Sequence, residues 1–182
     1  MVRRGAGRET RAGRPVVIAA LAAALAALVI PAPLAAQESG IGLARGATPS
    51  GVALERLDGG GGTVDLSEVI GTRPVLLEFW ATWCGNCEEL HPHMLEAHER
   101  YGDEVAMYAV AVGVNQTPRR IRRHLEDHPL PFPMLWDGKG AAARAFAAPT
   151  TSYIVVLDAA GRVTYTGAGA EQDLEAAVRS AL

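Results

Sequence analysis

Residues 75–87 constrain the fold of this 182-residue chain more than any other segment. Residues 75–80 form a near-continuous apolar run, which is typical of a strand buried on both faces of a sheet. Both cysteines of the chain, Cys84 and Cys87, come shortly after this run. Over residues 84–101 the apolar positions recur at the spacing of a helix. We therefore expect a buried central strand that turns into a helix at a C-x-x-C motif.

The rest of the chain alternates predicted strands with predicted helices. Strands are expected at residues 52–57, 63–66, 105–114, 132–135, 152–157 and 162–166, and helices at 118–127, 140–146 and 173–182. This alternation predicts an α/β fold, in which a central mixed β-sheet carries helices on both faces and has an N-terminal β extension. Residues 51–182 make up this domain and are enough to bury a core. Residues 37–50, which mix Gly, Ala, Ser and Pro, are expected to be a flexible lead-in.

The first 36 residues have the three regions of a secretory signal. Residues 1–14 hold five arginines and one glutamate, residues 16–30 are apolar, and small residues precede Ala36. We expect cleavage after Ala36, because the apolar run is shorter than the roughly 20 residues that a membrane span needs. The alternative is an uncleaved anchor over residues 16–36. In either case the protein is expected to be exported to the periplasm or another extracytoplasmic compartment.

The charge balance argues against a nucleic-acid partner. The whole chain has a net charge of −3, and residues 1–36 contribute five basic groups and one acidic group. Residues 37–182 therefore carry a net charge of −7. An acidic domain offers no electrostatic footprint for a phosphate backbone, so we expect no nucleic acid to bind.

Three stretches of the sequence resemble the thioredoxin superfamily. Residues 79–87, Phe-Trp-Ala-Thr-Trp-Cys-Gly-Asn-Cys, resemble its active-site segment, and most of all that of the exported TlpA- and ResA-like disulfide reductases. Pro92 matches the proline of the kinked helix in that family, and residues 148–151, Ala-Pro-Thr-Thr, resemble the loop that carries its cis-proline. The resemblance covers roughly residues 50–182. It implies a thioredoxin fold and thiol:disulfide oxidoreductase activity.

The two cysteines have the placement of a working redox pair. A disulfide across so short a loop removes little chain entropy, so it is a poor structural staple. Cys84 stands at a helix start, where free backbone N–H groups and a partial positive charge favour the thiolate. Cys87 lies one turn further along the helix, within reach of the first sulfur. We expect Cys84 to attack a substrate disulfide and Cys87 to resolve the mixed disulfide, with no cofactor beyond this pair.

Glu78 interrupts the apolar run six residues before Cys84. Burial raises the pKa of a carboxyl group, which makes Glu78 a candidate proton acceptor for Cys87; the alternative is a partly exposed acid at a strand margin. The resemblance agrees with the first interpretation, since thioredoxins carry an acid at this position. The resemblance also implies a set of substrate-binding residues: Trp83, Gly85, Asn86, Ala148, Pro149 and Thr150. If the peptide bond before Pro149 is cis, it turns the preceding backbone toward Cys84, where it could pair with an incoming peptide.

Other uses of these residues define the alternatives. A metal site would have four ligands to draw on: Cys84, Cys87, His91 and His93. All four come from one mostly helical stretch, whereas zinc sites usually draw on two separate segments, so we expect no metal. A redox-inert module that binds a metal or a partner protein is a further alternative, as is a net oxidant or isomerase. The resemblance implies a reductase with protein disulfide substrates and a membrane-bound dithiol electron donor, and one candidate task is cytochrome c maturation. We expect the protein to be a monomer.

Overall fold

The computed structural model describes residues 41–182. The predicted signal sequence at residues 1–36 lies outside the described residues, and so does the choice between its cleavage and an anchor over residues 16–36. Residues 41–182 belong to one compact unit. Within residues 41–182, none of the helices has the length and apolar character that a membrane crossing requires.

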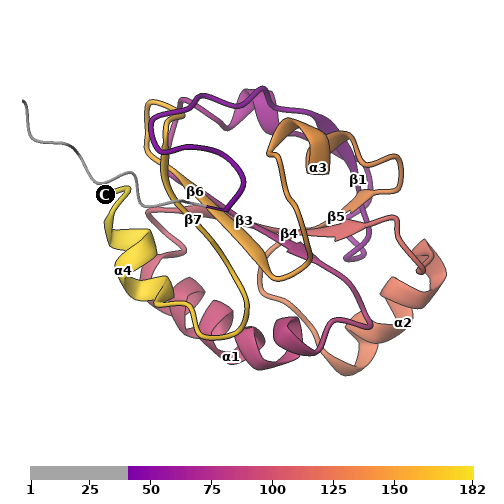
Figure 1. The fold of residues 1–182 in the computed structure, drawn as a ribbon. Helices are drawn as coiled ribbons and strands as arrows, with labels where there is room; N and C mark the ends of the chain where they lie inside the picture. The colour runs from indigo at the N-terminus through magenta and orange to yellow at the C-terminus, as the bar shows by residue number, and fades with distance from the viewer. Residues whose placement is uncertain (1–40) are drawn as a thin grey trace, which may run out of the picture. The chain divides into compact units, whose positions relative to one another are not determined.

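Seven strands form one mixed sheet in the order β2-β1-β5-β4-β3-β6-β7 (Figure 1). The strands are β1 Ala53–Arg56, β2 Thr63–Asp65, β3 Val75–Trp80, β4 Ala106–Val112, β5 Met134–Asp137, β6 Tyr153–Leu157 and β7 Val163–Ala168. β3 pairs in parallel with β4 and antiparallel with β6, and all six of its residues are buried. The β1–β2 hairpin joins the sheet through the antiparallel pairing of β1 with β5, which confirms the predicted N-terminal β extension.

Helices cover both faces of this sheet. They are α1 Gly85–Tyr101, α2 Pro118–Asp127, α3 Ala141–Ala145 and α4 Leu174–Arg179, with a short 3₁₀ helix at Leu66–Glu68. Apolar residues of α1, α2 and α4 pack into one core on one face, and those of α3 and the 3₁₀ helix pack into a second core on the other. Figure 1 shows the same division, with α1, α2 and α4 on the side of the sheet away from α3. The predicted α/β architecture is confirmed.

The local sequence explains where the elements begin. Thr117 caps α2, because its hydroxyl oxygen accepts a hydrogen bond from the Arg120 N–H at 3.3 Å, and Pro118 occupies the first helical position. β5 starts at Met134, two residues later than the predicted strand. The preceding residue, Pro133, has no N–H to donate to a neighbouring strand, so regular pairing through both groups begins only after it.

The described part of the lead-in, residues 41–50, corrects the expectation of a flexible segment. The Gly46 N–H donates to the Val163 carbonyl oxygen at 2.8 Å, and the Val163 N–H donates to the Ala47 carbonyl oxygen at 2.8 Å. Leu43 and Ala47 also pack against the core on the α3 face. The Gly, Ala, Ser and Pro content of this segment indicates a low preference for helix or strand, but it carries no information about pairing with a distant strand.

Candidate active site

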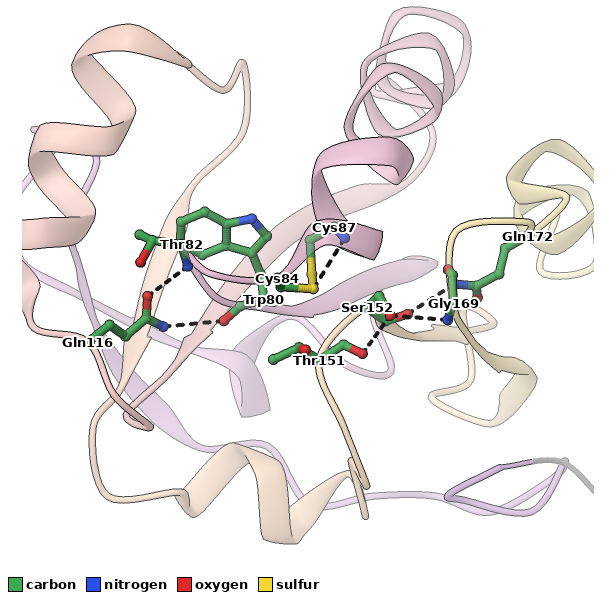
Figure 2. The surroundings of a disulfide bond; sticks show 9 residues. All are labelled: Trp80, Thr82, Cys84, Cys87, Gln116, Thr151, Ser152, Gly169 and Gln172. Carbon is green, nitrogen blue, oxygen red and sulfur yellow. Dashed lines mark hydrogen bonds between the residues drawn. A yellow bond between two sulfur atoms is a disulfide. The ribbon is translucent and has the colours of Figure 1, made fainter.

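The two cysteines lie where the chain passes from β3 into α1, as the sequence predicts. Cys84 is the N-cap of α1, and its sulfur accepts a hydrogen bond from the Cys87 N–H at 3.2 Å. The two residues form a disulfide with their Cα atoms 5.2 Å apart (Figure 2). In the reduced protein, the same N–H would stabilise a thiolate on Cys84 more than a thiol, because a charged acceptor strengthens the hydrogen bond.

The two sulfurs differ in their access to solvent. Cys84 is 6% exposed and Cys87 is 1% exposed. The three residues around Cys84, which are Trp83, Gly85 and Asn86, are all exposed. A substrate can therefore reach the disulfide at Cys84, while Cys87 belongs to the core between α1 and the sheet. This difference agrees with the predicted roles, in which Cys84 is the nucleophile and Cys87 resolves the mixed disulfide.

Glu78 lies in the middle of β3, paired with Ala109 of β4 and Ile154 of β6. Since side chains alternate along a strand, Glu78 faces the same side of the sheet as Leu76 and Trp80, which belong to the same core as both cysteines. Its side chain is buried, and its Oε1 atom has no hydrogen-bond partner among the described residues. Desolvation by burial raises the pKa of the Glu78 carboxyl to about 8. The alternative of a partly exposed acid is therefore wrong.

Gln116 fixes the loop between β3 and Cys84. Its Oε1 accepts a hydrogen bond from the Thr82 N–H at 2.9 Å, and its Nε2 donates to the Trp80 carbonyl oxygen at 3.4 Å (Figure 2). The same Nε2 also donates to the Val112 carbonyl oxygen at 2.6 Å. One buried amide thus connects the end of β4 to the loop that leads to Cys84. Sequence reasoning missed this residue, because a single glutamine between a strand and a helix cap carries no distinctive pattern.

A groove of about 550 Å³ lies beside the disulfide loop. Its walls come from Trp83, residues 112–114, residues 138–140, Ala143 and residues 148–151. Trp83 and Val114 leave 45% and 56% of their surfaces exposed, and the Trp83 Nε1–H donates to the Val114 carbonyl oxygen at 2.9 Å. The structure thus brings together four of the predicted substrate-binding residues: Trp83, Ala148, Pro149 and Thr150. The other two, Gly85 and Asn86, are exposed beside Cys84 in the first turn of α1 and do not line the groove.

Pro149 does not have the geometry that its sequence context suggests. Among residues 41–182 every peptide bond is trans, including the bond before Pro149. The antiparallel pairing of Phe79 with Tyr153 places Ser152, not Pro149, next to the end of β3. Figure 2 accordingly shows Thr151 and Ser152 in the surroundings of the disulfide. The backbone that flanks the sulfurs is therefore supplied by residues 151–152.

The residues of the alternative metal site do not converge. Cys84 and Cys87 are bonded to each other. His93 lies near Glu96, with 3.9 Å between Nδ1 and the carboxylate, and both side chains are exposed. In the described part of the chain, no three His, Cys, Asp or Glu side chains come close enough together to hold a metal ion.

Comparison with protein families and curated sequences finds relatives of the disulfide-exchange type. A family model described as Redoxin matches residues 43–182. The thioredoxin-like protein YneN of Bacillus subtilis is 35% identical over 92 residues, which are 49% of this chain and 52% of YneN. The thiol-disulfide oxidoreductase ResA of Oceanobacillus iheyensis is 33% identical over 95 residues, 50% of this chain and 48% of ResA. The match therefore spans about half the length of these two relatives.

Solved structures share the fold. A crystal structure from Chlorobium tepidum with the provisional name thiol:disulfide interchange protein DsbE has a TM-score of 0.68 and 26% sequence identity, and the match covers 76% of this chain and 98% of that one. The solution structure of a thioredoxin-like protein in its oxidised form has a TM-score of 0.62 and 25% identity, with 74% and 93% of the two chains covered. These likenesses confirm the predicted thioredoxin fold.

Proposed function

This chain belongs to the Redoxin family, within the TlpA- and ResA-like part of the thioredoxin superfamily, and from that premise we propose that it is a thiol:disulfide oxidoreductase that reduces protein disulfides. The observation that carries the proposal is the position of the Cys84 sulfur, which caps α1 and accepts the Cys87 N–H. The names of ResA and of the Bacillus subtilis thiol-disulfide oxidoreductase YkuV, 27% identical over 111 residues, support the same chemistry.

The first step is attack by Cys84 on the substrate. The Cys84 thiolate forms a bond to one substrate sulfur, and the substrate S–S bond breaks. The departing substrate sulfur leaves as a thiolate and takes a proton from the medium. The groove beside Trp83 gives the substrate chain a surface to lie on, because exposed apolar side chains line it next to the reacting sulfur.

The second step is resolution by Cys87. The Cys87 thiol must lose its proton before its sulfur can attack Cys84. Glu78 is the acceptor that we assign to this proton, because its carboxyl is buried in the same core and its raised pKa matches a thiol better than an ordinary carboxyl does. The second substrate sulfur then leaves, and the two electrons that reduced the substrate have been lost from the Cys84–Cys87 pair. The oxidised pair of the structure is the product of this step.

Turnover requires a donor that returns two electrons and two protons to the disulfide. For an exported protein we assign this part to a membrane-bound dithiol, since the export signal expected at residues 1–36 would place the protein in a periplasmic or other extracytoplasmic compartment. Protein disulfides, among them those of apocytochrome c, are the proposed substrates. We propose a reductase rather than a net oxidant, an isomerase or a redox-inert binding module, because the active-site segment at residues 79–87 resembles that of exported disulfide reductases.

The experiment that tests this function is the reduction potential of the Cys84/Cys87 couple, measured together with insulin reduction in the presence of dithiothreitol. A potential near about −270 mV with catalysed insulin reduction supports a reductant, whereas a value near about −120 mV identifies an oxidant. Absence of turnover combined with stoichiometric binding of zinc or copper would show that the chain is a redox-inert module.

A further inference from the structure

Ser152 has an unusual backbone for a buried serine. It is 1% exposed and has a φ of 56°, in the left-handed region that L-residues other than glycine rarely adopt. Its hydroxyl donates to the Thr151 carbonyl oxygen at 2.6 Å and accepts the Gly169 N–H at 3.1 Å. A conformation that costs free energy persists only where its surroundings hold it, and these hydrogen bonds are part of that hold.

Gln172 supplies the other hydrogen bonds that hold the Ser152 backbone in place. Its Nε2 donates to the Ser152 carbonyl oxygen at 3.0 Å and to the Gly169 carbonyl oxygen at 2.7 Å. The Tyr165 hydroxyl donates to the Oε1 of Gln172 at 3.1 Å, which fixes the orientation of the amide. Gly167 leaves the necessary space, because a Cβ atom there would fall 2.6 Å from that Oε1. We call the Ser152 and Gln172 side chains and their partners the Ser152–Gln172 lock.

The lock lies beside the reacting sulfurs. β6 pairs antiparallel with β3, and Tyr153 is opposite Phe79, so the residues before Tyr153 run alongside the loop that leads to Cys84. Figure 2 shows Ser152, Gly169 and Gln172 on the opposite side of the disulfide from Gln116. Thr151 lines the groove, and its backbone N–H has no hydrogen-bond partner within residues 41–182. A free donor at the end of a strand is the group that an extended peptide uses when it adds to a sheet.

We propose that Ser152 and Gln172 are positioning residues that hold the Thr151 backbone so that its N–H pairs with the extended peptide flanking a substrate disulfide. The inference rests on the proposed function and names the form of substrate that the site takes, which is an extended polypeptide. Side-chain hydrogen bonds to Ser152 hold the Thr151 backbone in position, whereas Pro149 lies three residues away from Ser152 and has a trans peptide bond before it.

The test is a comparison of a protein disulfide with a small one, using the full chain. Gln172→Leu and Ser152→Ala are expected to raise KM for insulin about five- to tenfold, the loss that a misplaced hydrogen bond causes, with kcat within about twofold. The rate with the small disulfide 5,5′-dithiobis(2-nitrobenzoate) and the Cys84/Cys87 reduction potential are expected to stay unchanged. If these residues only stabilised the fold, their substitution would not raise KM while leaving kcat unchanged, and it would not affect insulin while sparing the small disulfide.

The matched control is Ser180→Ala. Ser180 lies at the end of α4, and its hydroxyl also takes part in two hydrogen bonds: it donates to the Ala177 carbonyl oxygen at 2.6 Å and is paired with the Thr164 hydroxyl at 3.0 Å. Its KM for insulin should equal that of the parent. A second measurement is hydrogen exchange of the Thr151 N–H in the mixed disulfide that the Cys87→Ser variant forms with a peptide. We expect this N–H to become protected from exchange in that complex. The protection should be absent when Gln172→Leu is combined with Cys87→Ser.

The outcomes separate the two proposals. Variants with an unchanged KM, or with equal losses on both disulfides, would overturn the role of the lock and leave the proposed function in place. A parent that reduces the small disulfide but not insulin would contradict the proposed reduction of protein disulfides, and the lock would fall with it.

Discussion

Two parts of the molecule meet at the disulfide, and they are built in different ways. One wall, which we call the helix wall, consists of α1 with its cysteines and β3 with Glu78. The other, which we call the loop wall, consists of residues 151–152 and the side chain of Gln172. In the helix wall, regular strand and helix geometry sets the position of each reacting group. In the loop wall, irregular backbone is held in place by side-chain hydrogen bonds.

A glutamine serves each wall, and the two glutamines show the difference. Gln116 bonds to backbone groups of residues that lie at or just beyond the ends of β3 and β4, so it secures a turn between regular elements. Gln172 bonds to the carbonyl of Ser152, whose left-handed φ is itself irregular. The contrast suggests a division of labour in which the helix wall performs the sulfur chemistry and the loop wall positions the substrate.

The largest effect should come from the reacting sulfur of the helix wall. Cys84→Ser removes the nucleophile, and we expect turnover with insulin to fall at least about 10³-fold, because a hydroxyl does not form the mixed disulfide. Cys87→Ser leaves the first attack intact and should accumulate mixed disulfides that a non-reducing gel detects. Turnover that survives in the Cys84 variant would contradict the proposed mechanism and remove the chemical role of the helix wall.

The next effect tests the proton acceptor of the same wall. Glu78→Gln should slow resolution of the mixed disulfide roughly 10- to 100-fold at pH 8, as expected for the loss of a general base. Because the pKa of Glu78 is raised to about 8, the parent should resolve faster as pH rises toward that value, while the variant should lack this part of the profile. Rapid-mixing measurements of the resolution rate across pH 6–9 would show this difference between the parent and the variant. Matching profiles for the two proteins would exclude Glu78 from proton transfer.

The two walls also differ in how far the sequence predicts them. The apolar run at residues 75–80 and the helical spacing after Cys84 are periodic signals, so the strand, the helix start and both cysteines could be located. Ser152 gives no such signal, since a left-handed backbone held by Gln172 depends on a partner 20 residues away. Pro149 is the conspicuous residue in that stretch, so the sequence-based prediction names Pro149 as a substrate contact and does not reach Ser152, three residues further on.

A smaller effect concerns stability and follows from the burial of Glu78. Its folded-state pKa of about 8 lies above the ordinary value of 4.5, so the folded protein holds this proton more tightly than the unfolded chain. The unfolding free energy should therefore lose stabilisation as pH rises from about 4.5 to 8, and Glu78→Gln should escape that loss. At pH 9 we expect the variant to be more stable by roughly 2–5 kcal/mol, with little difference at pH 4. Urea unfolding at both pH values measures this.

The smallest effect should come from Pro149→Ala, and it sharpens the boundary of the loop wall. Pro149 lines the groove with Trp83, but its preceding peptide bond is trans and the disulfide is flanked by Ser152 instead. Alanine keeps the trans bond, so we expect KM for insulin to rise less than about twofold, below the five- to tenfold expected for Ser152→Ala. If Pro149→Ala raised KM for insulin more than Ser152→Ala did, the groove that Pro149 lines with Trp83 would position the substrate, rather than Thr151. The loop wall would then have to be defined by the groove and not by the hydrogen bonds to Ser152.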